Sequence, residues 1–275
     1  MARGAYFLTM KNTFLLFCTL ALFLSSCNNN GQIKCVTEIS TPISENVSST
    51  MNITLANPDD ICPISMPPDN KKEYTQKGLL AKEIFYTSDG TVSGAVTYEY
   101  TNGKETKQTK YSGTGSEENS IVTEYSDGKI SKSTCYTAFG TINYTDIFTY
   151  EKNKSTQQSI DENGNPFCIV QSTYDNNGNK IIEEIELAGV PVRITYTYDS
   201  NNLLIEQTES DNTKWLFKYD KNKNIIEKKC CYSDGSTSSE TYTLKYDDRN
   251  NWIEKTCYLD GKPIFKTKRT IEYFE

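Results

Sequence analysis

Nine cysteines and no histidine limit the chemistry open to this chain of 275 residues. A catalytic thiol needs a neighbouring base or some other means of lowering its pKa, and histidine is the usual base. The sequence holds no CxxC pair and no Cys/His cluster that could bind zinc, and it has no phosphate-binding loop. We therefore expect no metal, no cofactor and no enzymatic activity.

Cys27 is the cysteine with the most specific surroundings. The eleven residues Phe14–Leu24 are apolar and follow Lys11, as in a secretory signal, and the run is too short to span a bilayer. The run ends in Leu24, Ser25, Ser26 and Cys27, which resembles the lipobox of bacterial lipoproteins. The resemblance implies a signal peptide over residues 1–26, cleavage before Cys27 and lipid on Cys27.

Asn28 follows this cysteine, where an acidic residue would be an inner-membrane signal in many lipoproteins. The resemblance therefore implies a lipid-anchored protein of a bacterial cell envelope with an outer-membrane address. The lipid is then its contact with the membrane. The sequence leaves open whether translation starts at Met1 or Met10, and whether the protein faces the periplasm or the cell surface.

Residues 28–73 have the composition of a linker. They contain no Phe, Trp or Tyr and five of the eight prolines, so they offer little apolar area to offset the cost of ordering a chain. We expect a lipidated flexible tether over residues 27–73. Cys35 and Cys62 both lie in it and could form a disulfide, because the envelope permits such bonds.

The charge of the chain argues against a nucleic-acid partner. The formal net charge is −7, and because residues 1–26 contain Arg3, Lys11 and no acid, the mature chain carries −9. No basic cluster in the mature sequence offsets this acidity, whereas nucleic-acid binding is normally supported by a basic surface.

A tyrosine followed by a turn-forming cluster recurs nine times from residue 74 onward, at intervals of 21 to 27 residues. Each interval contains two short strand-like segments, separated by turns such as Asp127-Gly128 and Asp260-Gly261. This pattern predicts about eight β-hairpins of ~25 residues over residues 74–275. The tyrosines are Tyr74, Tyr100, Tyr125, Tyr150, Tyr174, Tyr198, Tyr219, Tyr246 and Tyr273.

The second strand of each unit alternates with period two, and its tyrosine falls on the apolar side. Such alternation indicates an antiparallel sheet with one packed face and one wet face. A sheet of about sixteen strands is expected to curl, with its apolar side chains on the concave side. We expect an all-β protein with a long curled or spiralling single sheet, and a closed wide barrel is the alternative.

The tyrosine, a following aspartate and an Asn/Gly-rich turn resemble the YD (RHS) repeat family. The best match is Tyr174-Asp175-Asn176-Asn177-Gly178-Asn179. The first units lack the aspartate and resemble equally the MORN-like hairpin repeats of some bacterial lipoproteins. The large toxin-enclosing members carry a C-terminal autoprocessing segment that this sequence lacks, so the resemblance implies repeat architecture without toxin delivery.

The repeat explains most conspicuous residues by folding alone. We interpret the cysteines that recur within it as small apolar packing residues. We interpret the recurring glutamates as part of a solvated face. Trp215 and Trp252 are candidate contacts for a ligand or partner, because planar rings can stack on sugars or peptides. We expect a non-catalytic interaction or scaffold role toward an envelope protein or glycan. The alternative is a carrier that binds an apolar, lipid-like ligand in the concave face.

Overall fold

In a computed structural model that describes residues 32–43, 67–187 and 189–275, the chain forms eighteen strands and an all-β fold. The strands are β1 (Ile33–Pro42), β2 (Asp69–Tyr74), β3 (Leu80–Tyr86), β4 (Val92–Thr101), β5 (Lys104–Ser112), β6 (Glu117–Ser126), β7 (Lys129–Thr137), β8 (Ile142–Tyr150), β9 (Lys154–Asp161), β10 (Pro166–Tyr174), β11 (Lys180–Leu187), β12 (Val190–Tyr198), β13 (Leu204–Glu209), β14 (Lys214–Tyr219), β15 (Ile225–Cys231), β16 (Thr237–Tyr246), β17 (Trp252–Leu259) and β18 (Lys262–Tyr273).

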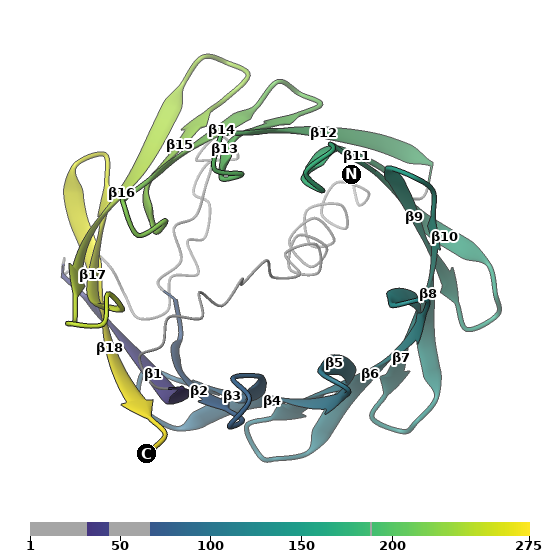
Figure 1. Cartoon of the computed structure of the whole chain (residues 1–275), viewed down its shortest axis with the longest axis horizontal. Helices are drawn as coiled ribbons and strands as arrows, with labels where there is room; N and C mark the ends of the chain where they lie inside the picture. The colour runs from purple at the N-terminus through teal and green to yellow at the C-terminus, as the bar shows by residue number, and fades with distance from the viewer. Residues whose placement is uncertain (1–31, 44–66, 188) are drawn as a thin grey trace, which may run out of the picture. The chain divides into compact units, whose positions relative to one another are not determined.

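Each strand from β2 to β18 pairs antiparallel with its neighbours in sequence, and the sheet closes through β1. Residues of β1 pair with β18 on one side, as in Glu38 opposite Arg269, and with β2 on the other, as in Glu38 opposite Asn70. Figure 1 shows the result as a ring in which β1 lies where the last strand meets the first repeat strands. The expected open sheet is therefore wrong, and its alternative, a closed wide barrel, is confirmed.

Closure has a simple physical cause. An open sheet of this length would leave unpaired N–H and C=O groups along two edges, and a barrel removes both edges. Eighteen strands spaced ~4.8 Å apart and tilted by ~40° enclose a ring roughly 35 Å across, wider than side chains alone can fill.

The predicted hairpins are present as β3 to β18, but the expected tether is wrong at two places. Residues 33–42 form β1, and residues 69–73 belong to β2. These two strands lack aromatic side chains for most of their length and are stabilised by backbone pairing instead. β1 is hydrogen-bonded on both sides. A strand held in this way needs less apolar area of its own, which is why composition did not reveal it.

Turn chemistry fixes the hairpins at the end of the barrel where the tyrosines lie. The two-residue turns Asn102-Gly103 and Asp127-Gly128 have positive φ at both positions, the geometry that matches the twist of the strands they join. In the longer turns an aspartate accepts two backbone N–H groups. Asp175, for example, accepts from Asn177 and Asn179 at 2.9 and 2.8 Å. The YD-like signature thus specifies turns.

Candidate ligand-binding surface

The repeated tyrosines form one rim of the barrel, where most of their hydroxyls bond to a preceding strand or turn. The hydroxyl of Tyr125 donates to the carbonyl of Glu105 at 2.8 Å, and that of Tyr198 to the carbonyl of Lys180 at 2.8 Å. Tyr100 and Tyr219 make the same bond to Leu80 and Leu204. Burial raises the pKa of Tyr100 to about 12, so the hydroxyl remains a donor. We call this set of nine residues the tyrosine rim.

The tyrosine-bearing face of the sheet is the inner one. Along β16, Tyr242, Leu244 and Tyr246 are half-buried, whereas Thr243 and Lys245 are exposed. The same alternation occurs along β12. Side chains on the concave face of a curved sheet converge and cover one another, whereas those on the convex face diverge. The exposure pattern therefore places the tyrosines and their apolar neighbours inside the barrel, as the sequence predicts.

The outer face carries ion pairs between adjacent strands. Glu184 and Arg193 lie opposite each other on β11 and β12, with a 3.0 Å contact, and each side chain is at least half exposed. Four similar pairs join Glu99 to Lys107, Glu124 to Lys132, Lys218 to Glu227 and Lys245 to Glu254. Barrels that span membranes present an apolar band outward, where a central Lys or Arg costs about 2–4 kcal/mol.

The inner wall becomes basic as well as aromatic on β15 to β18. The ammonium groups of Lys228 and Lys255 both lie near the ring of Tyr242, 6.0 and 5.4 Å from its centroid. Arg269 lies 3.5 Å from the ring centroid of Trp252, and Lys255 lies 5.1 Å from it. We call Lys228, Tyr242, Trp252, Lys255 and Arg269 the basic aromatic patch.

Arg269 also joins the patch to the strand that closes the barrel. Its Nε donates to Glu38 on β1 at 2.9 Å and its Nη2 donates to the same oxygen. Asn70 on β2 donates through Nδ2 to the other oxygen of Glu38 at 3.2 Å. Burial alone would raise the pKa of Glu38, but the charge and hydrogen bonds of Arg269 outweigh it, and the pKa lies below its ordinary value.

The two tryptophans singled out in the sequence lie on the inner wall but do not meet. Trp215 is on β14 and donates through Nε1 to Glu209 at 3.3 Å. Trp252 is on β17, three strands away and therefore roughly 14 Å or more distant. Sequence reasoning missed Lys228 and Lys255, although both occupy positions of the inner face where the pattern calls for apolar residues.

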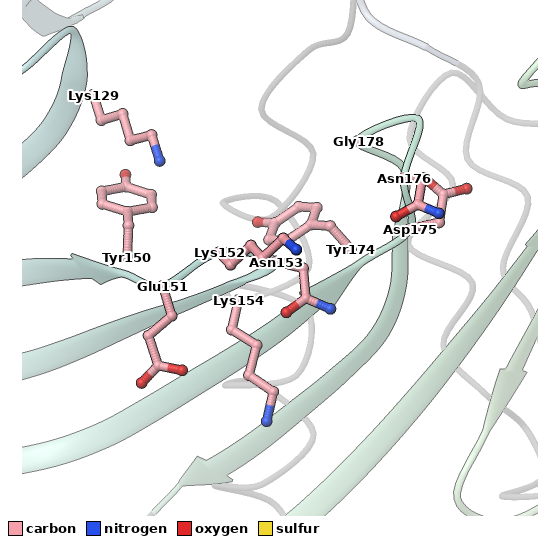
Figure 2. A pocket seen from close by; sticks show the side chains of 10 residues that line it. All are labelled: Lys129, Tyr150, Glu151, Lys152, Asn153, Lys154, Tyr174, Asp175, Asn176 and Gly178. Carbon is pink, nitrogen blue, oxygen red and sulfur yellow. The ribbon is translucent and has the colours of Figure 1, made fainter.

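A shallow groove lies on the tyrosine rim between three successive hairpins. It has a volume of about 430 Å³ and is lined by residues that include Lys129, Tyr150, Lys152 and Tyr174. Figure 2 shows the Lys129 ammonium pointing at the Tyr150 ring, 4.7 Å from its centroid. The groove is shallow and open to solvent, so we place the candidate site on the inner wall instead.

The cysteines of the repeats act as packing residues. Cys135 and Cys257 are buried on the inner side of β7 and β17. Burial raises the pKa of the Cys257 thiol to about 12, which suppresses the reactive thiolate. Within the described ranges, no group of three or more His, Cys, Asp and Glu side chains is arranged to hold a metal ion.

Several predicted residues lie outside the described part of the chain. They are Leu24, Ser25, Ser26, Cys27 and Cys62. Cys35 is buried on β1, and its pairing with Cys62 stays a prediction. Over the described residues, no helix is long and apolar enough to cross a bilayer.

Comparison with known proteins gives structural likeness only. No protein-family model matches the chain, and no curated protein matches it. A porin-like protein from Bacteroides uniformis is 14% identical over 87% of this chain and 96% of its own, with a TM-score of 0.42. A porin-like protein from Bacteroides vulgatus is 13% identical over 88% and 99%, with a TM-score of 0.39.

A third likeness is to the TcdB2-TccC3-Cdc42 structure, at 11% identity and a TM-score of 0.28. It covers 73% of this chain but only 14% of that much longer one. Likenesses this remote carry no argument about function. The class of the protein, a closed eighteen-stranded antiparallel β-barrel with an aromatic inner wall, follows from its own strand pairing and exposure pattern.

Proposed function

We propose that the protein is a lipid-anchored, non-catalytic binding protein of a bacterial cell envelope, addressed to the outer membrane. Its barrel stands in water beside the bilayer and holds a saccharide against the aromatic inner wall. The observation that carries this proposal is the distribution of side chains: ion pairs on the outer face and aromatic rings on the inner face. That is the reverse of a lipid-embedded barrel.

The anchor is proposed from the sequence. A lipid on Cys27 would attach the barrel to the membrane without inserting its strands, because several acyl chains give stable anchoring. The resemblance to YD repeats supports a repeat protein with an interaction role and adds no further activity.

A saccharide suits the inner wall because the wall alternates rings and polar groups. The flat faces of Tyr and Trp stack on the apolar faces of sugars, while inner-wall groups such as Gln207 and Glu240, which lie opposite Trp215 and Lys228 in the pairing, can exchange hydrogen bonds with hydroxyls. An apolar ligand, the alternative, would leave these polar groups unsatisfied.

Cell fractionation tests two parts of the proposal together: the lipid anchor, and the position of the barrel in water outside the bilayer. We expect the wild-type chain to pellet with membranes and to need detergent for release. Cys27→Ser should instead be recovered in the soluble fraction, folded and free of detergent, because its outer face needs no lipid. The matched variant Cys35→Ser should remain membrane-bound. Detergent-dependent solubility of folded Cys27→Ser would contradict the proposal.

Native mass spectrometry tests the binding role. Protein released gently from the envelope should carry an adduct of saccharide mass that is lost on denaturation. An adduct of lipid mass, beyond the anchor itself, would favour the carrier of an apolar ligand. A clean protein mass in the absence and presence of added envelope saccharides would argue against both binding roles.

A further inference from the structure

Two lysines on the inner wall have aromatic rings as neighbours where a carboxylate would be expected. Lys255 is half-buried, and burial, with the nearby charges of Arg269 and Lys228, lowers its pKa against the opposing charge of Glu38. Among the described residues, neither Lys255 nor Lys228 makes an ion pair with an acid within 4.0 Å. Ten other lysines do make such pairs: Lys71, Lys72, Lys107, Lys110, Lys132, Lys180, Lys214, Lys218, Lys245 and Lys266.

The nearby acids are already engaged. Glu38 is held by Arg269 and Asn70. Glu240, which lies opposite Lys228 in the strand pairing, accepts the hydroxyl of Tyr242. A desolvated cation is costly without a partner, so this part of the wall is prepared for an added anion.

The aromatic rings near the two lysines indicate that the ligand has an apolar face as well as an anionic group. Phe217 lies opposite Lys228 on β14, and Trp215 lies opposite Cys230 one inner-face position along. These rings extend the apolar wall beside the patch, where the flat face of a sugar can stack. A simple inorganic anion would use the lysines and leave the rings uncovered.

Asn70, opposite Glu38 in the strand pairing that closes the barrel, carries an unsatisfied acceptor. It is 7% exposed, and its Oδ1 is buried with no hydrogen-bond partner, a state that costs about 1–3 kcal/mol. The amide cannot simply be turned over, because Nδ2 donates to the Glu38 carboxylate.

Resting on the proposed binding function, we infer that the basic aromatic patch is the subsite for the negatively charged group of an acidic sugar. The ammonium groups of Lys255 and Lys228 bind the anionic group beside Tyr242, and the sugar ring stacks toward Phe217 and Trp215. Arg269 remains paired with Glu38 and keeps the patch in place. The anionic group is a carboxylate or a phosphate, since both accept from lysine.

The test is calorimetric titration of the full-length protein with glucuronate, glucose 6-phosphate and glucose. We expect glucuronate or glucose 6-phosphate, or both, to bind at least 10-fold more tightly than glucose, and the two arms identify the anionic group. Raising the salt concentration should weaken binding of the charged sugars and leave glucose unchanged.

Variants locate the site. Lys255→Gln and Lys228→Gln should each weaken binding of the charged sugar at least 10-fold and change glucose binding less than 2-fold. Lys229→Gln, on the same strand but on the outer face, should leave all three affinities unchanged. Unaltered thermal unfolding of each variant confirms that the fold is retained.

The outcomes separate the two proposals. Equal affinity for glucose and the charged sugars, or retention of the preference in Lys255→Gln, would overturn the acidic-sugar subsite and leave the proposed binding function standing. Failure of every saccharide to bind a protein that still yields a saccharide adduct from the envelope would also overturn the subsite alone. Failure of both assays would overturn both proposals.

Discussion

Glu38 and Arg269, 231 residues apart in the sequence, form an ion pair across the strand pairing that closes the barrel. The pair is mostly withdrawn from water, with side-chain exposures of 14% for Glu38 and 23% for Arg269. Removing one partner of such a pair leaves a poorly solvated charge.

Arg269→Met should therefore lower the free energy of unfolding by about 3 kcal/mol, measured by chemical denaturation. Lys107→Met is the control, because its pair with Glu99 spans 4.0 Å on the exposed outer face and should contribute less than about 1 kcal/mol. Equal effects of the two substitutions would show that closure does not depend on the buried pair.

Acid should weaken the same contact. The folded-state pKa of Glu38 lies below its ordinary value of 4.5. The stability from the pair is therefore complete above about pH 4.5 and is lost as the pH falls through the lower folded-state pKa. The difference in unfolding free energy between wild type and Arg269→Met should shrink below that pH. A difference that stays constant from pH 7 to pH 3 would contradict this assignment.

The tyrosine rim should contribute through its hydroxyls. Tyr125→Phe removes the bond to the Glu105 carbonyl and should cost about 1 kcal/mol of unfolding free energy. Tyr111→Phe provides the comparison: Tyr111 lies on the outer face of β5, opposite Ala95, and its hydroxyl makes no such bond to the described residues. Its removal should change stability by less than about 0.5 kcal/mol. A rim held only by ring packing would make the two substitutions alike.

Alkylation rates should separate the cysteines by burial. Cys257 is fully buried, and burial raises its pKa to about 12, whereas Cys231 is half-buried. In native protein at pH 8, we expect maleimide to label Cys231 well before Cys257, as mapped by peptide mass spectrometry. Labelling should become equal in denaturant. Rapid native labelling of Cys257 would mean that the thiol is reactive, against a packing role.

The hairpins could be predicted because their information is local. Tyr174 and the turn after it specify a strand end within six residues, and the alternation that follows fixes the inner face. Closure could not be predicted in the same way. β1 has no aromatic residue and is separated from β2 by 26 residues, and its partner β18 lies at the far end of the chain.

The basic aromatic patch was equally hidden, for a different reason. Each of Lys228, Lys255 and Arg269 looks like an ordinary charge interrupting one strand. Only the register of β15 to β18 brings them to one inner surface. Arg269 gave the nearest sequence signal, since it stands on the tyrosine-bearing side of its strand, between Thr267 and Ile271.

The position where β1 begins also limits how far the barrel could lie from a lipid on Cys27. Ile33 pairs with Tyr273 at the tyrosine rim, and only five residues separate it from Cys27. Five residues reach roughly 20 Å even when fully extended. A lipid on Cys27 would therefore keep Ile33, and with it this part of the tyrosine rim, within about that distance of the bilayer surface.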